Sequence, residues 1–234
     1  MPYTDFDIDQ LAVYLHLTPP QVAKLAERGK LPGRKVAGQW RFAKAEIHHW
    51  FEDRIGLSDE VELLEVEQTL ERSASAGQAK DISISDLLSI QAIAIPLRAR
   101  TRNSVINAIT DLAAGTGLLW DPKAMAEAVK SREQMHPTAL ENGVALMHPR
   151  RPMTKIISQP LLALGRTTTG IPFGGATPLT DIFFLICSVE DRGHLRILAR
   201  LSRLLTTPGF VDKLRESPDA ETAHRLFIDT EAAL

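Results

Sequence analysis

Residues 141–151 read Glu-Asn-Gly-Val-Ala-Leu-Met-His-Pro-Arg-Arg. The short apolar run after Gly143 predicts a buried strand that ends at His148, where a proline and two arginines turn the chain outward. This position is expected to expose one imidazole beside fixed positive charge. A neutral imidazole is nucleophilic near physiological pH, and arginines suit a tetrahedral anion such as a phosphoryl group better than a metal cation. His148 is therefore the candidate chemical centre, and neither a metal nor a cofactor is predicted.

Helices and strands alternate on both sides of this stretch. Some segments carry apolar residues at helical spacing, and short runs of β-favouring residues separate them. Such interleaving predicts a layered α/β domain rather than a helical bundle. The expected helices cover residues 85–88, 103–114, 122–133, 194–205, 210–215 and 220–228, and the expected strands cover 92–95, 143–148, 161–164 and 181–189.

Three motifs in this part of the chain resemble those of a known family. They are the pair Arg132-Glu133, the run from Gly143 to His148, and the helix start His194-Leu195-Arg196-Ile197-Leu198. In order and approximate spacing they are similar to the enzyme IIA domain of the fructose/mannitol class of the phosphotransferase system, nearest to its nitrogen-regulatory branch. The resemblance covers about residues 82–232 and implies the type 2 enzyme IIA fold, a mixed sheet flanked by helices.

The same resemblance implies roles for three residues. His148 accepts a phosphoryl group from a small carrier protein of the HPr type, His194 is the second active-site histidine that supports it, and Arg132 is the nearby arginine. The chemistry agrees, because one ring nitrogen of His148 must be unprotonated to attack while the other donates a hydrogen bond that fixes the tautomer. A helix that starts at His194 also favours an anion beside it.

Both neighbours of the candidate histidine depart from the family pattern. The family usually has proline before the histidine and glycine after it, whereas this chain has Met147 and Pro149. Pro149 removes a backbone N–H that could otherwise face the phosphoryl group. Arg150 and Arg151 either supply the lost positive field or belong to a solvated loop.

The first quarter of the chain has a basic face. Residues 21–44 carry seven Lys or Arg against a single acid, although the net charge of the whole chain is −2. Helices are predicted after Asp7 and from Thr18 to a stop at Gly29, and a hairpin is predicted with its turn at Gly38-Gln39. A last helix is expected to turn three residues inward: Ile47, Trp50 and Phe51.

Two short motifs in this region carry a second resemblance. Residues 29–32 read Gly-Lys-Leu-Pro and residues 38–42 read Gly-Gln-Trp-Arg-Phe, an order similar to the excisionase/MerR-like winged-helix family. The resemblance implies that the second helix enters the DNA major groove while the wing contacts the backbone. It places Gln21, Lys24 and Arg28 on the reading face and Arg34, Lys35 and Arg41 at phosphates.

DNA binding is not the only interpretation of this basic face. The same charges could simply solvate a small helical domain, or the domain could dock to a protein. One such module buries too little surface for tight specific DNA binding, so a homodimer or another partner would be required.

The organisation expected from these patterns has three parts. Residues 1–56 form the helix-turn-helix domain, residues 57–81 an acidic helix and linker, and residues 82–234 the enzyme IIA-like domain. No membrane segment or signal peptide is predicted, which favours the cytoplasm. The single cysteine, Cys187, lies in an apolar run and is expected to be a buried, inert thiol.

The expected function is regulatory. A phosphohistidine protein with a DNA-binding head would couple phosphotransferase flux to transcription or to nitrogen or carbon regulation. Two alternatives stay open: a non-catalytic regulator that acts through protein interaction, and a component that passes phosphate onward in sugar transport.

Overall fold

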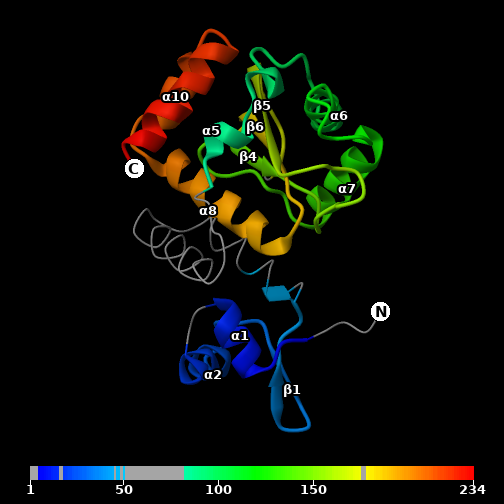
Figure 1. Ribbon diagram of the computed structural model, residues 1–234, viewed down its shortest axis with the longest axis vertical. Coiled ribbons are helices and arrows are strands. Elements are labelled where there is room, and N and C mark those ends of the chain that lie inside the picture. Colours follow the sequence, from blue (N-terminus) through cyan, green and yellow to red (C-terminus); the bar gives the residue numbers. More distant parts are fainter. Residues whose placement is uncertain (1–4, 16–17, 45, 48–49, 51–81, 175–177) are drawn as a thin grey trace. The chain divides into compact units, whose positions relative to one another are not determined.

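Two compact units, Met1–Asp81 and Ile82–Leu234, divide the chain in the computed structural model (Figure 1). The structure describes residues 5–15, 18–44, 46–47, 50, 82–174 and 178–234. The acidic helix and linker predicted for residues 57–81, and the boundary predicted at residue 56, lie outside the described residues.

The first unit contains two helices followed by a hairpin (Figure 1). The helices are α1 (Ile8–Leu15) and α2 (Pro19–Glu27), and the strands are β1 (Arg34–Val36) and β2 (Gln39–Arg41). Both predicted helices and the predicted hairpin are therefore confirmed. The buried side chains of this unit are apolar: Leu11, Ala12, Leu15, Val22, Ala26, Leu31, Phe42 and Ile47. Of the residues predicted to turn inward, Ile47 is buried, Trp50 is half-buried, and Phe51 lies outside the described residues.

The ends of α2 follow from its sequence. Thr18 is the N-cap, and the Oε1 atom of Gln21 accepts hydrogen bonds from the backbone N–H of Thr18 at 2.8 Å and from its hydroxyl at 2.9 Å. Gly29 follows the helix with a φ of 66°, and the N–H of Lys30 donates back to the carbonyl of Leu25 at 2.9 Å. A glycine in the left-handed region is the usual way to close a helix in this geometry.

The hairpin turn lies one residue earlier than predicted. Val36 pairs with Gln39, so Ala37 and Gly38 form the two-residue loop, with φ values of 50° and 80°. Two successive positive φ values match the right-handed twist of a tight hairpin. The predicted turn, Gly38-Gln39, was wrong by one residue because a glycine can occupy either the first or the second position of such a turn, and the sequence does not distinguish the two.

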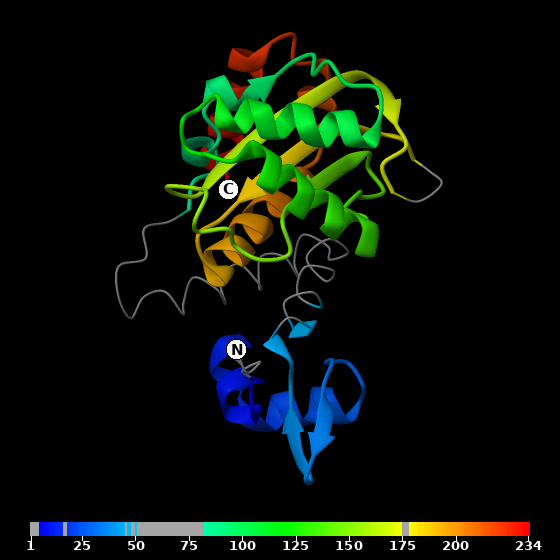
Figure 2. The ribbon, with the colours of Figure 1, turned by 90° about the vertical axis from the view of Figure 1, so that its right-hand side faces the viewer.

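The second unit is built on a four-stranded mixed sheet (Figure 2). Its order is β3-β5-β6-β4, with β3 (Ile93–Ala94) parallel to β5 (Leu161–Ile171), β5 antiparallel to β6 (Thr180–Cys187), and β4 (Val144–Met147) parallel to β6. This confirms the predicted α/β fold class. β5 is much longer than the predicted segment 161–164. The prediction stopped early because the second half of the strand is polar, with Thr168 and Thr169 exposed, and so lacks an apolar pattern.

Helices cover both faces of this sheet (Figures 1 and 2). On one face, Phe183 and Leu185 of β6 join the apolar cluster of α6 (Arg102–Ala114) and α7 (Pro122–Met135). On the other face, Phe184 packs edge-on against Phe227, with ring centroids 6.0 Å apart. Successive residues of a strand point to opposite faces, so a strand covered on both sides is apolar throughout. The helices on this second face are α5 (Ile84–Leu87), α8 (Asp191–Thr206), α9 (Phe210–Glu216) and α10 (Ala220–Ala232). The short helix η1 (Ile90–Ala92) leads into β3, and its Ala92 belongs to the cluster on the first face.

Cys187 lies at the end of β6 and is fully buried, as predicted. Burial raises the pKa of the Cys187 thiol to about 12. At pH 8 only on the order of one thiol in 10,000 would be ionised, and the thiolate is the reactive form. We expect no reaction of the native chain with an aromatic disulfide reagent over many minutes, and one equivalent released after unfolding in guanidinium chloride. Rapid release of one equivalent from the native chain would contradict this.

Glu231 of α10 holds the first residues of the second unit. Its carboxylate accepts hydrogen bonds from the backbone N–H groups of Ile84 at 2.7 Å and Ser85 at 2.9 Å. The hydroxyls of Ser83 and Ser85 donate to it at 3.0 and 2.7 Å. Burial opposes the ionisation of this carboxylate, but the hydrogen bonds, led by those from Ser85, outweigh burial and lower the pKa of Glu231.

The substitution Glu231→Gln is expected to lower the free energy of unfolding by about 2 kcal/mol at pH 7, because several donors lose a charged acceptor. A carboxylate with a lowered folded pKa stabilises the protein above its ordinary pKa of 4.5, and the stabilisation is lost as the pH falls through the folded pKa. Denaturant unfolding of the wild type and the variant should therefore differ at pH 7, and the difference should shrink as the pH falls from 4.5 through the lower folded pKa of Glu231. Glu216→Gln, an exposed site, serves as the control. A difference that stays equal as the pH falls would contradict the expectation.

Candidate functional site

His148 follows directly after β4, at the edge of the sheet where β4 and β6 both end. Parallel neighbours end on the same side, so the residues that follow β4 and β6 meet there. The side chain of His148 is only 2% exposed. The expectation of an exposed imidazole is therefore wrong: the ring folds back toward its own strand and against a second imidazole instead of following the arginines into solvent.

One hydrogen bond sets the tautomer of the neutral His148 ring. The Nδ1 atom of His148 lies 2.8 Å from the carbonyl oxygen of Leu146. A carbonyl oxygen only accepts, so Nδ1 carries the proton and the lone pair of the neutral ring lies on Nε2. The Nε2 atom, which carries this lone pair, is buried as well.

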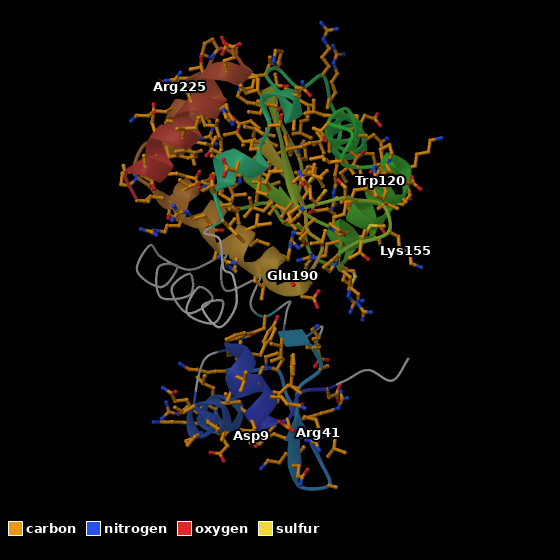
Figure 3. All side chains as sticks on the ribbon, in the orientation of Figure 1. Asp9, Arg41, Trp120, Lys155, Glu190 and Arg225 are labelled. Carbon is orange, nitrogen blue, oxygen red and sulfur yellow. The ribbon has the colours of Figure 1, made fainter. Side chains whose placement is uncertain are left out.

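His194 lies against this ring. It occupies the first turn of α8, where its N–H donates to the carbonyl of Glu190 at 3.0 Å, and its side chain is 4% exposed. The ring centroids of His148 and His194 are 4.7 Å apart, with an interplanar angle of 58°. Figure 3 labels Glu190, the N-cap that precedes α8, at the start of that helix. The helix begins at Asp191, three residues before the predicted start. The prediction began too late because Gly193 and the two charged residues before it interrupt the apolar pattern of the helix.

Arg132 reaches the same region from α7. It is 6% exposed, and its Nη1 atom donates to the carbonyl of His136 at 2.6 Å. The segment after α7 runs antiparallel to β4, with Leu146 N–H donating to Thr138 O at 3.1 Å and Leu140 N–H donating to Val144 O at 2.7 Å. The end of α7 is thereby held next to the end of the strand that carries His148.

The two arginines after the histidine are both exposed. Pro149 is buried, and the chain then turns outward through Arg150 and Arg151, as predicted. Met147 packs in the apolar cluster beneath the site. Met147 and Pro149, the two neighbours of His148 that depart from the family pattern, therefore both occupy buried positions.

Sequence reasoning gave no role to Glu133 or Thr138. Glu133 is 1% exposed, and its carboxylate accepts from the N–H of Thr138 at 3.1 Å, from the Thr138 hydroxyl, and from Arg102 Nη2 at 3.2 Å. The signal in the sequence was Glu133 itself, a charged residue inside the apolar stripe of a helix. Buried carboxylates need partners, so such a position points to a hydrogen-bonded network.

The six residues predicted to face DNA all lie in the first unit. Lys24 and Arg28 are exposed, on α2 and at its C-cap. Gln21 is exposed too, but its Oε1 atom is used at the N-cap of its own helix. The three hairpin cations each have a neighbour: Arg34 pairs with Asp5 at 2.7 Å, Lys35 lies 5.1 Å from the centre of the Trp40 ring, and Arg41 donates to Gln39 Oε1 at 3.0 Å. Arg41 is labelled in Figure 3.

Two negative findings apply to the part of the chain that the structure describes. Among those residues, no group of three or more His, Cys, Asp or Glu side chains is arranged to hold a metal ion. No helix within the same residues is long and apolar enough to span a membrane.

Comparison with known proteins identifies both parts of the chain. The model of the type 2 enzyme IIA domain of the phosphoenolpyruvate-dependent sugar phosphotransferase system matches residues 86–229, which is more than half of the 234 residues. The chain belongs to this enzyme IIA family. A helix-turn-helix domain model matches residues 6–55 of this enzyme IIA protein.

Relatives include regulatory and sugar-specific proteins. The enzyme IIA protein is 32% identical over 145 residues to a nitrogen regulatory protein of Bradyrhizobium diazoefficiens, covering 60% of this chain and 92% of that protein. It is 28% identical over 142 residues to a fructose-specific EIIA component of Haloferax volcanii, covering 59% of this chain and 90% of that component.

Solved structures support the same fold. Enzyme IIAMTL of Escherichia coli, in complex with phosphorylated enzyme IIBMTL, superposes with a TM-score of 0.55 at 16% identity, covering 61% of this chain and 99% of that one. The nitrogen regulatory protein IIA-Ntr of Neisseria meningitidis superposes with a TM-score of 0.52 at 18% identity, covering 62% and 98%.

Proposed function

We propose that the enzyme IIA domain accepts a phosphoryl group on Nε2 of His148 from an HPr-type carrier in the cytoplasm. The helix-turn-helix unit would bind DNA. The phosphorylation state of the protein would thereby be coupled to transcription, or to the regulation of nitrogen or carbon use. The observation that supports this most is the hydrogen bond from His148 Nδ1 to Leu146 O, which directs the lone pair of a buried imidazole to Nε2. The second imidazole 4.7 Å away and the regulatory relatives add to it.

The transfer requires little covalent chemistry from the protein. The lone pair on Nε2 attacks phosphorus, the bond from phosphorus to the carrier breaks, and the carrier group keeps that electron pair. The Nδ1 proton stays on the ring, where Leu146 O stabilises the positive charge that the phosphorylated ring gains. Catalysis is then alignment and electrostatic stabilisation of the moving phosphoryl group.

Four features would supply positive potential to that group. His194 lies beside the attacking ring, and the N-terminal end of the long helix α8 carries a partial positive charge. Arg132 approaches from α7, and Arg150 and Arg151 follow the histidine in the chain. A protonated His194 could donate to a phosphoryl oxygen, which gives it a role only when the phosphoryl group is present.

The burial of Nε2 sets a condition on transfer. A phosphorus atom has to come within bonding distance of an atom that solvent does not reach in this structure. Docking of the carrier must therefore turn the His148 or His194 ring, or shift the chain that covers them. Such side-chain changes are common when proteins bind.

A transfer assay tests the phosphoryl part of the proposal. The full chain is incubated with labelled phosphoenolpyruvate, enzyme I and an HPr-type carrier, and the label should appear on the chain in an acid-labile, base-stable form, as a phosphoramidate does. Omission of the carrier should remove it. Absence of label with carriers of both the sugar and the nitrogen branch would overturn the proposal.

DNA binding by the full chain is expected to weaken steeply with salt, because each phosphate contact releases counterions. Lys24→Gln and Arg28→Gln should each lower the slope of log affinity against log salt by about 1. Lys123→Gln, an exposed change in the other unit, should leave the slope unchanged. Fluorescence anisotropy with a duplex in a series of salt concentrations measures this, and a salt-independent affinity would argue against phosphate contacts. Specific binding would further require a homodimer or a partner on DNA.

A second candidate function is docking to a protein through the first unit. The observation in its favour is that Arg34, Lys35 and Arg41 each already have a partner within the first unit, Asp5, Trp40 and Gln39 respectively. Onward transfer to a sugar-specific second domain is the third candidate, in keeping with the fructose-specific relative. A chase of the labelled chain with such a domain separates this candidate from a regulatory role.

A further inference from the structure

Glu133 is the most deeply buried carboxylate near the candidate site. The side chain has no exposed surface, yet it lies in the last turns of a surface helix. Removing a carboxylate from water is costly unless hydrogen bonds and an opposite charge compensate. Three donors do so here: Arg102 Nη2 at 3.2 Å, the Thr138 N–H at 3.1 Å, and the Thr138 hydroxyl.

These donors come from separate segments. Arg102 is the first residue of α6, and its Nη2 atom also donates to the backbone carbonyl of Glu133. Thr138 belongs to the segment that follows α7. Glu133 thus fastens the start of α6 and the end of α7 to Thr138.

The contacts continue from Thr138 to the reactive ring. Thr138 O accepts from the N–H of Leu146 at 3.1 Å, and Leu146 O accepts from Nδ1 of His148 at 2.8 Å. The Leu146 residue is therefore held on one side by Thr138 while it holds the imidazole on the other. Any shift of Thr138 moves the carbonyl group that selects the tautomer of His148.

Arg132, which precedes Glu133, anchors the same segment at His136, two residues before Thr138. Arg132 Nη1 donates to His136 O at 2.6 Å, while Glu133 binds Thr138. Adjacent positions at the end of one helix thus fix both ends of residues 136–138. The cation of the pair donates to a carbonyl, and the carboxylate accepts from an N–H and a hydroxyl.

We propose that Glu133 is a positioning residue for phosphoryl acceptance, acting through Thr138 and Leu146 on the tautomer and orientation of His148. This inference rests on the proposed role of His148 as phosphoryl acceptor. Glu133 itself does not contact the phosphoryl group in this scheme. Its loss lowers the fraction of His148 rings that present a lone pair on Nε2 in the attacking geometry.

Two substitutions at Thr138 form a matched pair. Thr138→Val keeps the shape and the backbone bond to Leu146 but removes the hydroxyl donor to Glu133, whereas Thr138→Ser keeps the hydroxyl. Glu133→Gln replaces an acceptor of three hydrogen bonds with a group that must turn a donor toward one of them. Transfer to Glu133→Gln and to Thr138→Val should be about tenfold slower, and transfer to Thr138→Ser should stay near the wild-type rate.

Nitrogen-15 NMR of the histidine rings, recorded above their pKa on the full chain without any phosphoryl donor, tests the positioning directly. Wild-type His148 should show the tautomer with the proton on Nδ1. His224 is an internal reference, because its Nε2 atom lies 3.1 Å from Ser85 O and should carry the proton there. Glu133→Gln and Thr138→Val should shift His148 toward a mixture of tautomers and leave His224 unchanged.

The outcomes are separable. Folded Glu133→Gln and Thr138→Val variants that keep both the wild-type tautomer and the wild-type transfer rate would overturn the inference. If Glu133→Gln does not fold, the contrast between Thr138→Val and Thr138→Ser decides, and equal spectra for the two would overturn it. A wild-type chain that takes no phosphoryl group would refute the proposed function, while the tautomer measurement would still decide the role of Glu133.

Discussion

Replacement of His148 with alanine is expected to abolish phosphoryl transfer to this chain. The substitution removes Nε2, the atom on which the hydrogen bond from Nδ1 to Leu146 O leaves the lone pair of His148. A lost nucleophile is not replaced by the surrounding electrostatic groups, which only stabilise a reaction at that atom. The label transferred from phosphoenolpyruvate through enzyme I and the carrier should fall to background.

Two controls make this result interpretable. His148→Ala leaves a cavity at a buried position, so its thermal unfolding and circular dichroism must show a folded domain before the transfer result counts. His224→Gln removes a histidine of α10 that binds Ser85 on another part of the domain, and it should be labelled like the wild type. Labelling of His148→Ala at the wild-type level would place the acceptor on another residue.

The substitution His194→Ala is expected to slow transfer about 100-fold, the usual effect of removing one donor aimed at developing charge in a transition state. The expectation follows from the ring centroid distance of 4.7 Å and from the burial of both imidazoles, which strengthens electrostatic interactions between them and a phosphoryl group. His194→Gln keeps a donor and should recover part of the rate. Single-turnover transfer from the phosphorylated carrier measures the step itself.

The same variant separates two roles for His194. If the ring only covers Nε2, its removal opens the site and transfer to His194→Ala should be faster than to the wild type. If the ring stabilises the phosphoryl group, transfer should be slower even though the site is more open. A faster rate would contradict the role proposed here.

The sequence was sufficient to predict the order of strands and helices along the second unit and the position of His148 at the end of a strand. A strand that helices cover on both faces, such as β6, is a continuous apolar run, and such a run is readily predicted as a buried strand. The second half of β5 was missed because it is polar and includes the exposed residues Thr168 and Thr169, so it lacks an apolar run. The start of α8 was misplaced because a glycine in the first turn hides the helical pattern.

The chemical centre could be predicted only in outline. His148 was chosen from its place at the end of an apolar run, and the resemblance supported it and added His194. The burial of the ring and the tautomer with its lone pair on Nε2 were not predicted, because the Leu146 carbonyl that binds Nδ1 carries no sequence signal. The contacts of Glu133 join residues from three segments and depend on tertiary packing. In the first unit, the cations were placed correctly on the helix and hairpin, while their partners Asp5, Gln39 and Trp40 became visible only in three dimensions.

The most direct test of the central claim is phosphorus and nitrogen-15 NMR of the chain after phosphorylation by the carrier. The geometry predicts a phosphorus atom coupled to Nε2 of His148, with Nδ1 still protonated and hydrogen-bonded to Leu146 O. A phosphoryl group on Nδ1 of His148, on His194 or on any other residue would contradict it.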